Sequence, residues 1–357
     1  MERWMNMKII KLAVLGMNHG FKFAKDALTL PDVELVAVAG DNELAVQRAQ
    51  ELNVPLYRNY KDLIDEQELD GVIICLPNRL HREAVEYCAN KGIHVQVEKP
   101  IADTIEDGEA MIRICAQNNV RLMVGHHRRF SSKIAKLKEV VASGKIGDII
   151  GVNILWVLAK DRPYYAEKWR VEQGGGPLLI NSIHDIDNLR FVTGLKIESV
   201  YAAARNRIRQ NQVEDSASVL LETYEGATIN YFVSDGIPSP WSYEFNLREN
   251  PKYHYYEQDS YHFYGTKGSI SFPSLTMYSY DDEKYGWEEE LIIEKVEADQ
   301  NDPMTAELKH FVAVLRGEEE PRVTGEDALE TLKVINAIRK SAETRQKVCI
   351  NQSTVVS

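Results

Sequence analysis

Apolar and polar positions alternate in blocks along the first third of the chain. Short apolar runs that are typical of buried strands cover 9–15, 33–39, 71–76, 93–97 and 121–124. Between them, segments with apolar residues every three or four positions predict helices over 21–30, 43–52, 80–90 and 103–118. Strands that alternate with helices of this length predict an α/β fold with a parallel, doubly wound sheet and right-handed crossovers.

The pattern changes in the middle of the chain, after a further helical segment at 134–143. Alternation with a period of two predicts strands at 149–158, 199–204, 217–222, 228–233, 261–264, 269–272 and 289–293. This stretch favours a large, mostly antiparallel open sheet in an α+β domain. Helical spacing returns at 304–315 and 325–343. We therefore divide the chain into residues 1–127, 128–300 and 301–357, and expect the last helices to pack back on the first part.

Composition narrows the classes of function. The net charge of −12, from 42 basic and 54 acidic residues among 357, argues against a broad surface for nucleic acid or an anionic membrane. No stretch approaches 18 apolar residues, no signal peptide is recognisable, and no set of His, Cys and Asp has the spacing of a metal site. The four cysteines form no C-x-x-C pair and fit free thiols. We expect a cytoplasmic protein without a metal.

A glycine-containing turn follows the first predicted strand. Gly16, Asn18, His19 and Gly20 stand between that strand and the first predicted helix, where a dinucleotide-binding fold has its phosphate-binding turn. Gly16 permits a tight turn, and the N-terminus of the helix offers amide groups to a pyrophosphate. The full G-x-G-x-x-G pattern is absent because Asn18 occupies the second glycine position, and a plain turn is the alternative interpretation.

Asp41 ends the second predicted strand, 25 residues beyond Gly16. A carboxylate at this position can accept hydrogen bonds from a ribose diol and repels a 2′-phosphate. Asp41 therefore favours NAD over NADP as the cofactor. The alternative is that Asp41 only caps the helix predicted from residue 43.

Two further turns at the same predicted sheet edge carry polar residues. Pro77, Asn78 and His81 follow the third strand, and we expect them to face the cofactor, although His81 also suits an exposed helix start. Glu98 and Lys99 follow the fourth strand. Charged residues at the carboxyl end of an apolar strand stand where open α/β sheets bind ligands, and a solvated strand end is the alternative.

A second group of polar residues lies in the run 174–190, which opens with three glycines. In the helical segment that follows, Asn181, His184 and Asn188 share one face, and Asp187 stands three residues beyond His184. A histidine is the natural proton acceptor near neutral pH. Taken alone, His184 is better explained as a histidine bonded to a neighbouring acid inside a domain interface.

With these motifs together, the chain resembles the Gfo/Idh/MocA family of NAD(P)-dependent oxidoreductases over nearly its whole length. The resemblance rests on the Gly16 turn, Glu98-Lys99-Pro100, the VGHHRRF sequence at 124–130, the run 174–187 and the YGTKG sequence at 264–268. The E-K-P tripeptide and the GGG…H…D run are specific in combination. The resemblance implies an N-terminal Rossmann domain for the cofactor and a C-terminal open sheet for the substrate.

The resemblance also assigns roles to individual residues. It implies that Lys99 binds and polarises the reacting oxygen of the substrate and that His184 is the catalytic histidine. Many members carry an aspartate four residues before this histidine, but the present chain has Ile180 there and Asn181 beside it. Asn181 and Asp187 are then the polar candidates for substrate binding near His184.

Aromatic and basic side chains gather in the segment that begins at Trp156. Trp156 and Tyr165 offer aromatic faces that suit the C–H faces of a sugar, and Lys160 and Arg170 are cations that could meet a carboxylate or a phosphate. A place in the core or in an interface is the alternative for Trp156. By resemblance, Arg128 also matches a position near the substrate.

We interpret the protein as an oxidoreductase that moves a hydride between NAD, or less favourably NADP, and the CH–OH or C=O group of a sugar, a cyclic polyol or a derivative. Lys99 as an ammonium would stabilise the developing alkoxide, and neutral His184 would take the proton. Two alternatives stay open: an NAD-dependent elimination or glycoside cleavage without net redox change, and a non-catalytic dinucleotide-binding sensor. The resemblance further implies a homo-oligomer, a dimer or tetramer, formed through the C-terminal sheet.

Overall fold

The computed structural model describes residues 8–172, 175–281 and 283–350. Gly174, the first glycine of the second motif, lies outside these residues. The chain forms two compact units, the first ending at Phe130 and resuming over Asp302–Leu332, and the second containing the rest. Helix α10 (Pro303–Leu315) thus belongs to the first unit, and α11 (Gly325–Thr344) passes from the first into the second.

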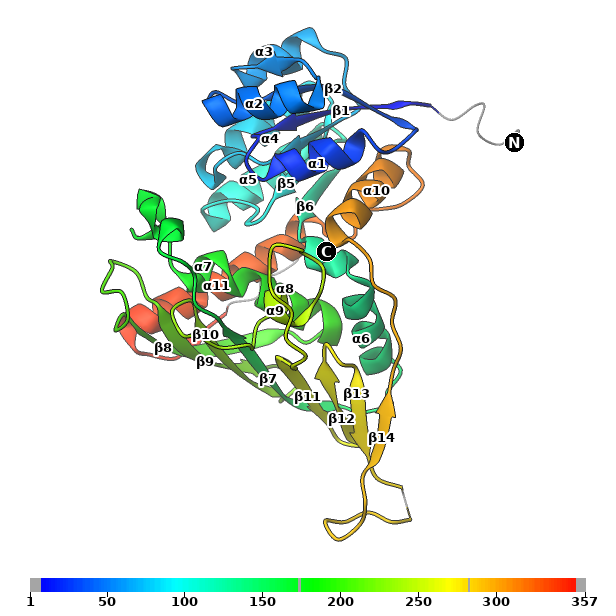
Figure 1. Ribbon diagram of the computed structural model, residues 1–357, viewed down its shortest axis with the longest axis vertical. Coiled ribbons are helices and arrows are strands. Elements are labelled where there is room, and N and C mark those ends of the chain that lie inside the picture. The colour runs from blue at the N-terminus through cyan, green and yellow to red at the C-terminus, as the bar shows by residue number, and fades with distance from the viewer. Residues whose placement is uncertain (1–7, 173–174, 282, 351–357) are drawn as a thin grey trace, which may run out of the picture. The chain divides into compact units, whose positions relative to one another are not determined.

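Six parallel strands form the sheet of the first unit, in the order β3-β2-β1-β4-β5-β6 (Figure 1). Their bounds are β1 Ile10–Leu15, β2 Val33–Ala39, β3 Leu56–Tyr57, β4 Gly71–Ile74, β5 His94–Glu98 and β6 Leu122–Gly125. The strand order reverses between β1 and β4, and a sheet of this kind binds ligands outside its carboxyl ends at that point. The predicted doubly wound α/β fold is confirmed.

Helices cover both faces of this sheet. One face packs against α1 (Gly20–Ala27), α2 (Glu43–Leu52) and α10. The other packs against α3 (Tyr60–Glu66), α4 (His81–Asn90), α5 (Ile105–Gln117) and the start of α11. Side chains along a strand point to alternate faces, so Leu12 and Val14 of β1 join the first core and Ala13 and Leu15 the second. Strand β3 was not predicted, because a strand of two residues shows no period in the sequence, and α3, a helix of seven residues, was not predicted either.

The second unit is built on a nine-stranded sheet of order β14-β13-β12-β11-β7-β10-β9-β8-β15. Its strands are β7 Ile149–Val157, β8 Ile197–Arg205, β9 Ser216–Thr223, β10 Thr228–Ser234, β11 Tyr261–Gly265, β12 Gly268–Phe272, β13 Thr276–Ser279, β14 Ile292–Lys295 and β15 Val348–Cys349. All neighbouring strands are antiparallel except β7 and β10, which run parallel. The prediction of a large, mostly antiparallel sheet is confirmed.

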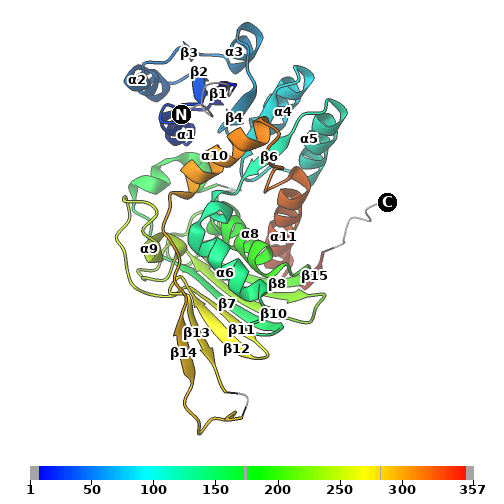
Figure 2. The ribbon, with the colours of Figure 1, turned by 90° about the vertical axis from the view of Figure 1, so that its right-hand side faces the viewer.

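Helices pack on one face of the nine-stranded sheet (Figure 2). They are α6 (Ser132–Ala142), the short α7 (Pro177–Ile180), α8 (Ser182–Thr193) and the later part of α11. A separate short helix, α9 (Tyr243–Asn246), follows β10. Buried aromatic side chains fill the core between sheet and helices, among them Trp156, Tyr231 and Phe263. Within the described residues, no helix is long and apolar enough to cross a membrane.

Candidate active site

The turn after β1 is shaped for a close approach of backbone to a ligand. Gly16 has a φ angle of +90°, and a Cβ atom on it would lie 2.3 Å from the carbonyl oxygen of Cys75. Only glycine fits here without strain. His19 is the N-cap residue of α1 and makes no side-chain hydrogen bond to the helix, so the first-turn amide groups stay open to a phosphate. Gly20, the first residue of α1, packs directly on Val14 and Cys75.

Arg48 braces this turn from helix α2. Its guanidinium donates hydrogen bonds to the carbonyl oxygens of Met17 and Asn18, the latter at 2.7 Å, and lies 4.8 Å from the ring centre of Phe21. Asn18 therefore holds the turn through its backbone. Arg48 could not be predicted as part of this turn, because an arginine on an amphipathic helix carries no signal that it contacts a turn 30 residues earlier.

Asp41 stands at the carboxyl end of β2 with its side chain exposed. The alternative that Asp41 caps the next helix is wrong, because Asn42 is the cap of α2 and accepts a 2.9 Å hydrogen bond from the amide of Ala45. The Asp41 carboxylate thus remains available to a ribose. The Gly16 turn, the first turn of α1 and the Asp41 carboxylate are the groups that could hold a dinucleotide.

His81 lies inside the first unit rather than on its surface. Its Nδ1 atom is 3.1 Å from the carbonyl oxygen of Pro100, and its Nε2 atom is 3.0 Å from that of Leu76. Burial lowers the pKa of His81, whose ring lies between the turns that follow β4 and β5. Pro77 and Asn78 lie in the first of these turns, where Asn78 opens a short 3₁₀ helix.

Charged groups meet where β5 and β6 end. Glu98 is 8% exposed, and its Oε1 atom lies 3.5 Å from Nε2 of His19. A Cβ atom on Gly125 of β6 would be 2.9 Å from the same oxygen, so the carboxylate depends on glycine for its space. Burial, reinforced by the charges of Arg128, His19 and Lys99, lowers the pKa of His127 well below its usual range.

The structure thus brings together His19, Glu98 and Lys99, which the sequence analysis had named for the cofactor and the reaction. It adds neutral His127, which that analysis did not single out. Arg128 is 2% exposed, and its neighbour Arg129 forms an ion pair with Asp327.

In the second unit, several polar residues of α8 are buried, and Asp185 is bonded to the core of the sheet. Asp185 accepts hydrogen bonds from the hydroxyls of Tyr231, at 2.9 Å, and Tyr261. It therefore anchors α8 to the sheet. His184, Asp187 and Asn188 are also buried, with His184 the most exposed of the three at 8%. The backbone amide of His184 bonds to the carbonyl oxygen of Asn181, which fixes the start of the helix.

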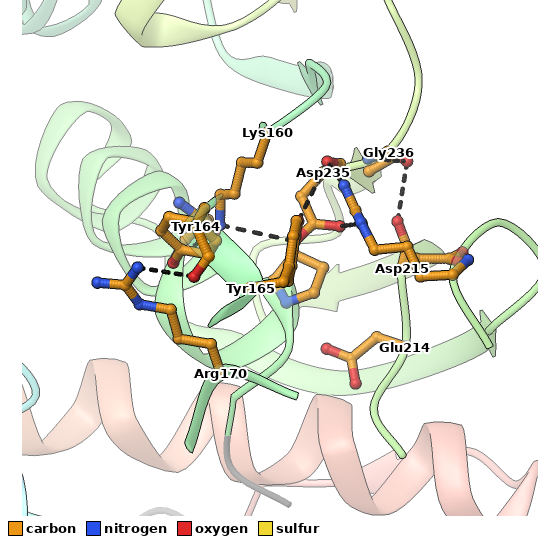
Figure 3. A network of polar contacts seen from close by, with 12 residues as sticks. Lys160, Tyr164, Tyr165, Arg170, Glu214, Asp215, Asp235 and Gly236 are labelled. Carbon is orange, nitrogen blue, oxygen red and sulfur yellow. Dashed lines mark hydrogen bonds and ion pairs between the residues drawn. The ribbon is translucent and has the colours of Figure 1, made fainter. Parts of the chain in front are cut away.

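A polar network lies beside this helix start (Figure 3). The ammonium of Lys160 donates hydrogen bonds to Oδ1 of Asn181 at 2.8 Å and to the hydroxyl of Tyr164 at 3.2 Å, and lies 3.6 Å from Oδ2 of Asp235. Tyr165 donates a 2.6 Å hydrogen bond to the same carboxylate. Burial lowers the pKa of Lys160 to about 8.

Arg209 completes the network through an ion pair with Asp235, and its guanidinium lies 3.9 Å from the ring centre of Tyr165. Trp156 is buried and donates a 2.7 Å hydrogen bond to Glu244, so it belongs to the wall of this region and not to an open face. Asp235 and Arg209 could not be predicted from the sequence. Asp235 directly follows β10 and reaches Lys160 because β10 pairs with β7, and Arg209, from the segment between β8 and β9, joins through Asp235.

The first unit has the fold and the phosphate turn of a dinucleotide-binding oxidoreductase, and comparisons with known proteins agree. Residues 10–126 match the oxidoreductase family with an NAD-binding Rossmann fold, and residues 134–271 match the GFO/IDH/MocA C-terminal domain. The chain belongs to the Gfo/Idh/MocA family of oxidoreductases, as its motifs predicted.

Several relatives match nearly the whole chain. A myo-inositol 2-dehydrogenase of Thermotoga maritima is 27% identical over 354 residues, which cover 96% of this chain and 99% of the relative. A scyllo-inositol 2-dehydrogenase (NAD(+)) of Bacillus subtilis is 26% identical and covers 91% and 92%. An oxidoreductase of Agrobacterium radiobacter, solved with NAD+, L-tartaric acid and magnesium, shares the fold with a TM-score of 0.81 at 20% identity, covering 96% and 99%.

Proposed function

We propose that the protein oxidises a CH–OH group of a sugar, a cyclic polyol or a derivative, or reduces the matching carbonyl. The observation that carries this proposal is the pair Lys99 and His184, both retained in a chain that aligns end to end with inositol dehydrogenases. A non-catalytic sensor would have no need of both residues. NAD, when bound, accepts the hydride from the substrate carbon.

The protein's own residues supply binding and proton transfer. The Gly16 turn and the first turn of α1 bind the pyrophosphate, and Asp41 binds the adenosine ribose. The Lys99 ammonium stabilises the negative charge that develops on the substrate oxygen. The His184 imidazole receives the hydroxyl proton, a role that contributes about 10²–10⁴-fold in general acid–base catalysis.

The test is a panel of inositols and sugars with NAD and with NADP, followed by absorbance of the reduced cofactor. His184→Ala should lower turnover by about 10²–10⁴-fold while NAD still binds. Lys99→Met should be as severe, because Glu98 would then stand near the substrate without an opposing charge. Matched controls are His254→Ala and Lys25→Met, two exposed positions whose loss should leave turnover unchanged.

Turnover of His184→Ala equal to that of the native enzyme would refute its role as a proton acceptor. Formation of product without net accumulation of reduced cofactor would point instead to a transient oxidation, as in elimination or glycoside cleavage. Binding of NAD with no turnover of any compound would favour a sensor.

We also propose that a second copy of the chain covers the open face of the nine-stranded sheet. A row of side chains crosses this face through paired positions on five neighbouring strands: Tyr201, Leu220, Asn230, Asn153 and His262. Tyr201 and Leu220 are 45% and 40% exposed. An open sheet face with large apolar side chains gains free energy when another copy buries it.

Light scattering after size exclusion tests this surface. Leu220→Arg should lower the molar mass from a dimer or tetramer towards a monomer, because an arginine in a buried sheet-to-sheet contact has no partner. Leu28→Arg, an equally exposed leucine on the first unit, is the matched control and should not change the mass. A native protein that is monomeric at all concentrations would refute the proposal.

All four cysteines are free thiols. Proteins of reducing compartments keep their thiols in this form, which supports our proposal that the enzyme works in the cytoplasm. A tagged copy that fractionates outside the cytoplasm would contradict it.

A further inference from the structure

Arg170 is a cation that the protein does not neutralise. It closes the short 3₁₀ helix Lys168–Arg170, and its Nη1 atom donates a 2.8 Å hydrogen bond to the carbonyl oxygen of Tyr164. Across the described residues, no carboxylate pairs with Arg170, and its buried Nε atom has no hydrogen-bond partner. Charge-assisted hydrogen bonds are worth more than neutral ones, so a guanidinium with spare donors is a site for an anion.

Two aromatic rings hold this guanidinium in place. Its central carbon lies 4.0 Å from the ring centre of Tyr164 and 5.2 Å from that of Trp169. In Figure 3 the guanidinium points away from Asp235. Stacking fixes the plane of an arginine, and a fixed plane lowers the entropic cost of binding a ligand through two parallel hydrogen bonds.

The acidic residues of the same segment are already engaged. Asp161 accepts a 3.1 Å hydrogen bond from the amide of Tyr164, and Glu172 lies 3.5 Å from the ammonium of Lys168. Asp235 is held by Arg209 and by the hydroxyl of Tyr165. None of these carboxylates is left over to satisfy Arg170.

Lys160 adds a second positive charge on the ring of Tyr164. Its ammonium lies 4.3 Å from the ring centre, and its side chain is 12% exposed. Burial holds the pKa of Lys160 at about 8, which means that the charged form is costly in the absence of a further anion. A negative group bound near Tyr164 would stabilise the charged form of Lys160.

We propose that Arg170, supported by Lys160, binds an anionic substituent of the substrate, so that the preferred sugar or polyol carries a carboxylate or a phosphate ester. This inference rests on the proposed oxidoreductase function and specifies its substrate class. The two oxygens of a carboxylate or phosphate match the fork of an arginine, whereas a neutral hydroxyl uses one donor only. The exposed ring of Trp169, beside Arg170, then offers a surface to the C–H face of the sugar.

The experiment compares matched compounds: uronic acids with their parent sugars, aldonic acids with alditols, and sugar phosphates with free sugars. The native enzyme should show a kcat/KM at least about tenfold higher for one charged series than for its neutral parents, consistent with one charge-assisted hydrogen bond or more. The series that gains identifies the anion as a carboxylate or a phosphate.

Arg170→Gln should lower the ratio of charged to neutral kcat/KM by about 10- to 100-fold, because it removes the charge and keeps hydrogen-bonding capacity. Arg170→Lys should restore part of the ratio. Arg162→Gln, an exposed arginine of the same segment, is the matched control and should leave the ratio unchanged. Circular dichroism of each variant verifies that it is folded.

A second readout does not depend on turnover. Trp169 contacts Arg170, so binding of the charged compound should change tryptophan fluorescence, with a Kd raised about 10- to 100-fold in Arg170→Gln. A preference for neutral compounds, or an unchanged ratio and Kd in Arg170→Gln, would overturn the inference. Absence of turnover with every compound in the native enzyme would instead refute the oxidoreductase proposal, and the fluorescence titration would still decide whether Arg170 binds anions.

Discussion

Lys160 donates a 2.8 Å hydrogen bond to Asn181, the N-cap residue of α8, and so ties the segment after β7 to the helix that carries His184. Asn181 in turn accepts the backbone hydrogen bond of His184 at 3.1 Å. The residue four positions before His184 is Ile180, which offers no acid to the histidine. A lysine and an amide thus organise the polar surroundings of the helix start.

The pKa of Lys160 near 8 predicts an alkaline limit on activity. Above this pH the ammonium of Lys160 loses its proton and becomes a neutral amine. It then no longer attracts the Asp235 carboxylate, and it can donate two hydrogen bonds instead of three. We expect kcat/KM of the native enzyme to fall above pH 8. In Lys160→Met, kcat/KM should be about tenfold lower than in the native enzyme at pH 7 and should show no such fall at alkaline pH. A pH–rate profile from 6 to 10 measures it. Lys160→Arg should move the limb to higher pH, while exposed Lys168→Met should keep the native profile.

Asp41 should determine the choice of cofactor. Replacement by serine removes both the ribose hydrogen bonds and the repulsion of a 2′-phosphate. We expect the ratio of kcat/KM with NADP to that with NAD to rise by about 10- to 100-fold in Asp41→Ser. Glu43→Gln, an exposed acid in the first turn of α2, serves as the control. A native enzyme that prefers NADP would contradict the role given to Asp41.

Glu307 should make stability depend on pH. This residue of α10 is 0% exposed, neither of its carboxyl oxygens has a hydrogen-bond partner in the described part of the chain, and burial with the nearby charge of Glu98 raises its pKa well above the usual range. The folded protein therefore keeps a proton that the unfolded chain releases above about pH 4.5.

This difference in bound protons between the folded and the unfolded chain makes the free energy of unfolding depend on pH. The free energy of unfolding should fall as pH rises above 4.5, by about 1.4 kcal/mol for each unit by which the pKa is raised, until the folded protein also ionises. Urea unfolding between pH 5 and 9 should show a flatter profile for Glu307→Gln than for the native protein. Exposed Glu51→Gln should follow the native profile. Equal slopes for Glu307→Gln and the native protein would show that Glu307 is ionised in the fold.

Local pattern predicted what depends on neighbouring residues. Five of the six strands of the first unit appeared within one or two residues of their expected ends, and Gly16 could be assigned because a turn at that point requires a positive φ angle. Asp41 could be placed on the sheet edge because it stands at the end of the second strand. The roles of Lys99 and His184 were predicted from the resemblance of their motifs to the family, which needs no knowledge of packing.

Contacts between distant segments could not be predicted. His81 looked like a helix start, but its position between the turns after β4 and β5 gives both ring nitrogens a backbone carbonyl. Asp185 gave no signal in the sequence, but the sheet brings two tyrosine hydroxyls to it. The tertiary fold determines which residues make such contacts, and the periodicity of a single sequence does not indicate them.

The parallel pairing of β7 and β10 also bears on how the enzyme becomes active as it folds. The paired residues Asn153 and Asn230 are 77 positions apart, and this pairing brings Ala159 beside Gly236, next to Lys160 and Asp235. Long-range strand pairing carries a large loop-closure cost and forms slowly. A slip of one residue would turn the side chains of β10 to the opposite face. The Lys160–Asp235 contact therefore arises only after this closure has occurred in the correct register, and a nascent or misregistered chain lacks it.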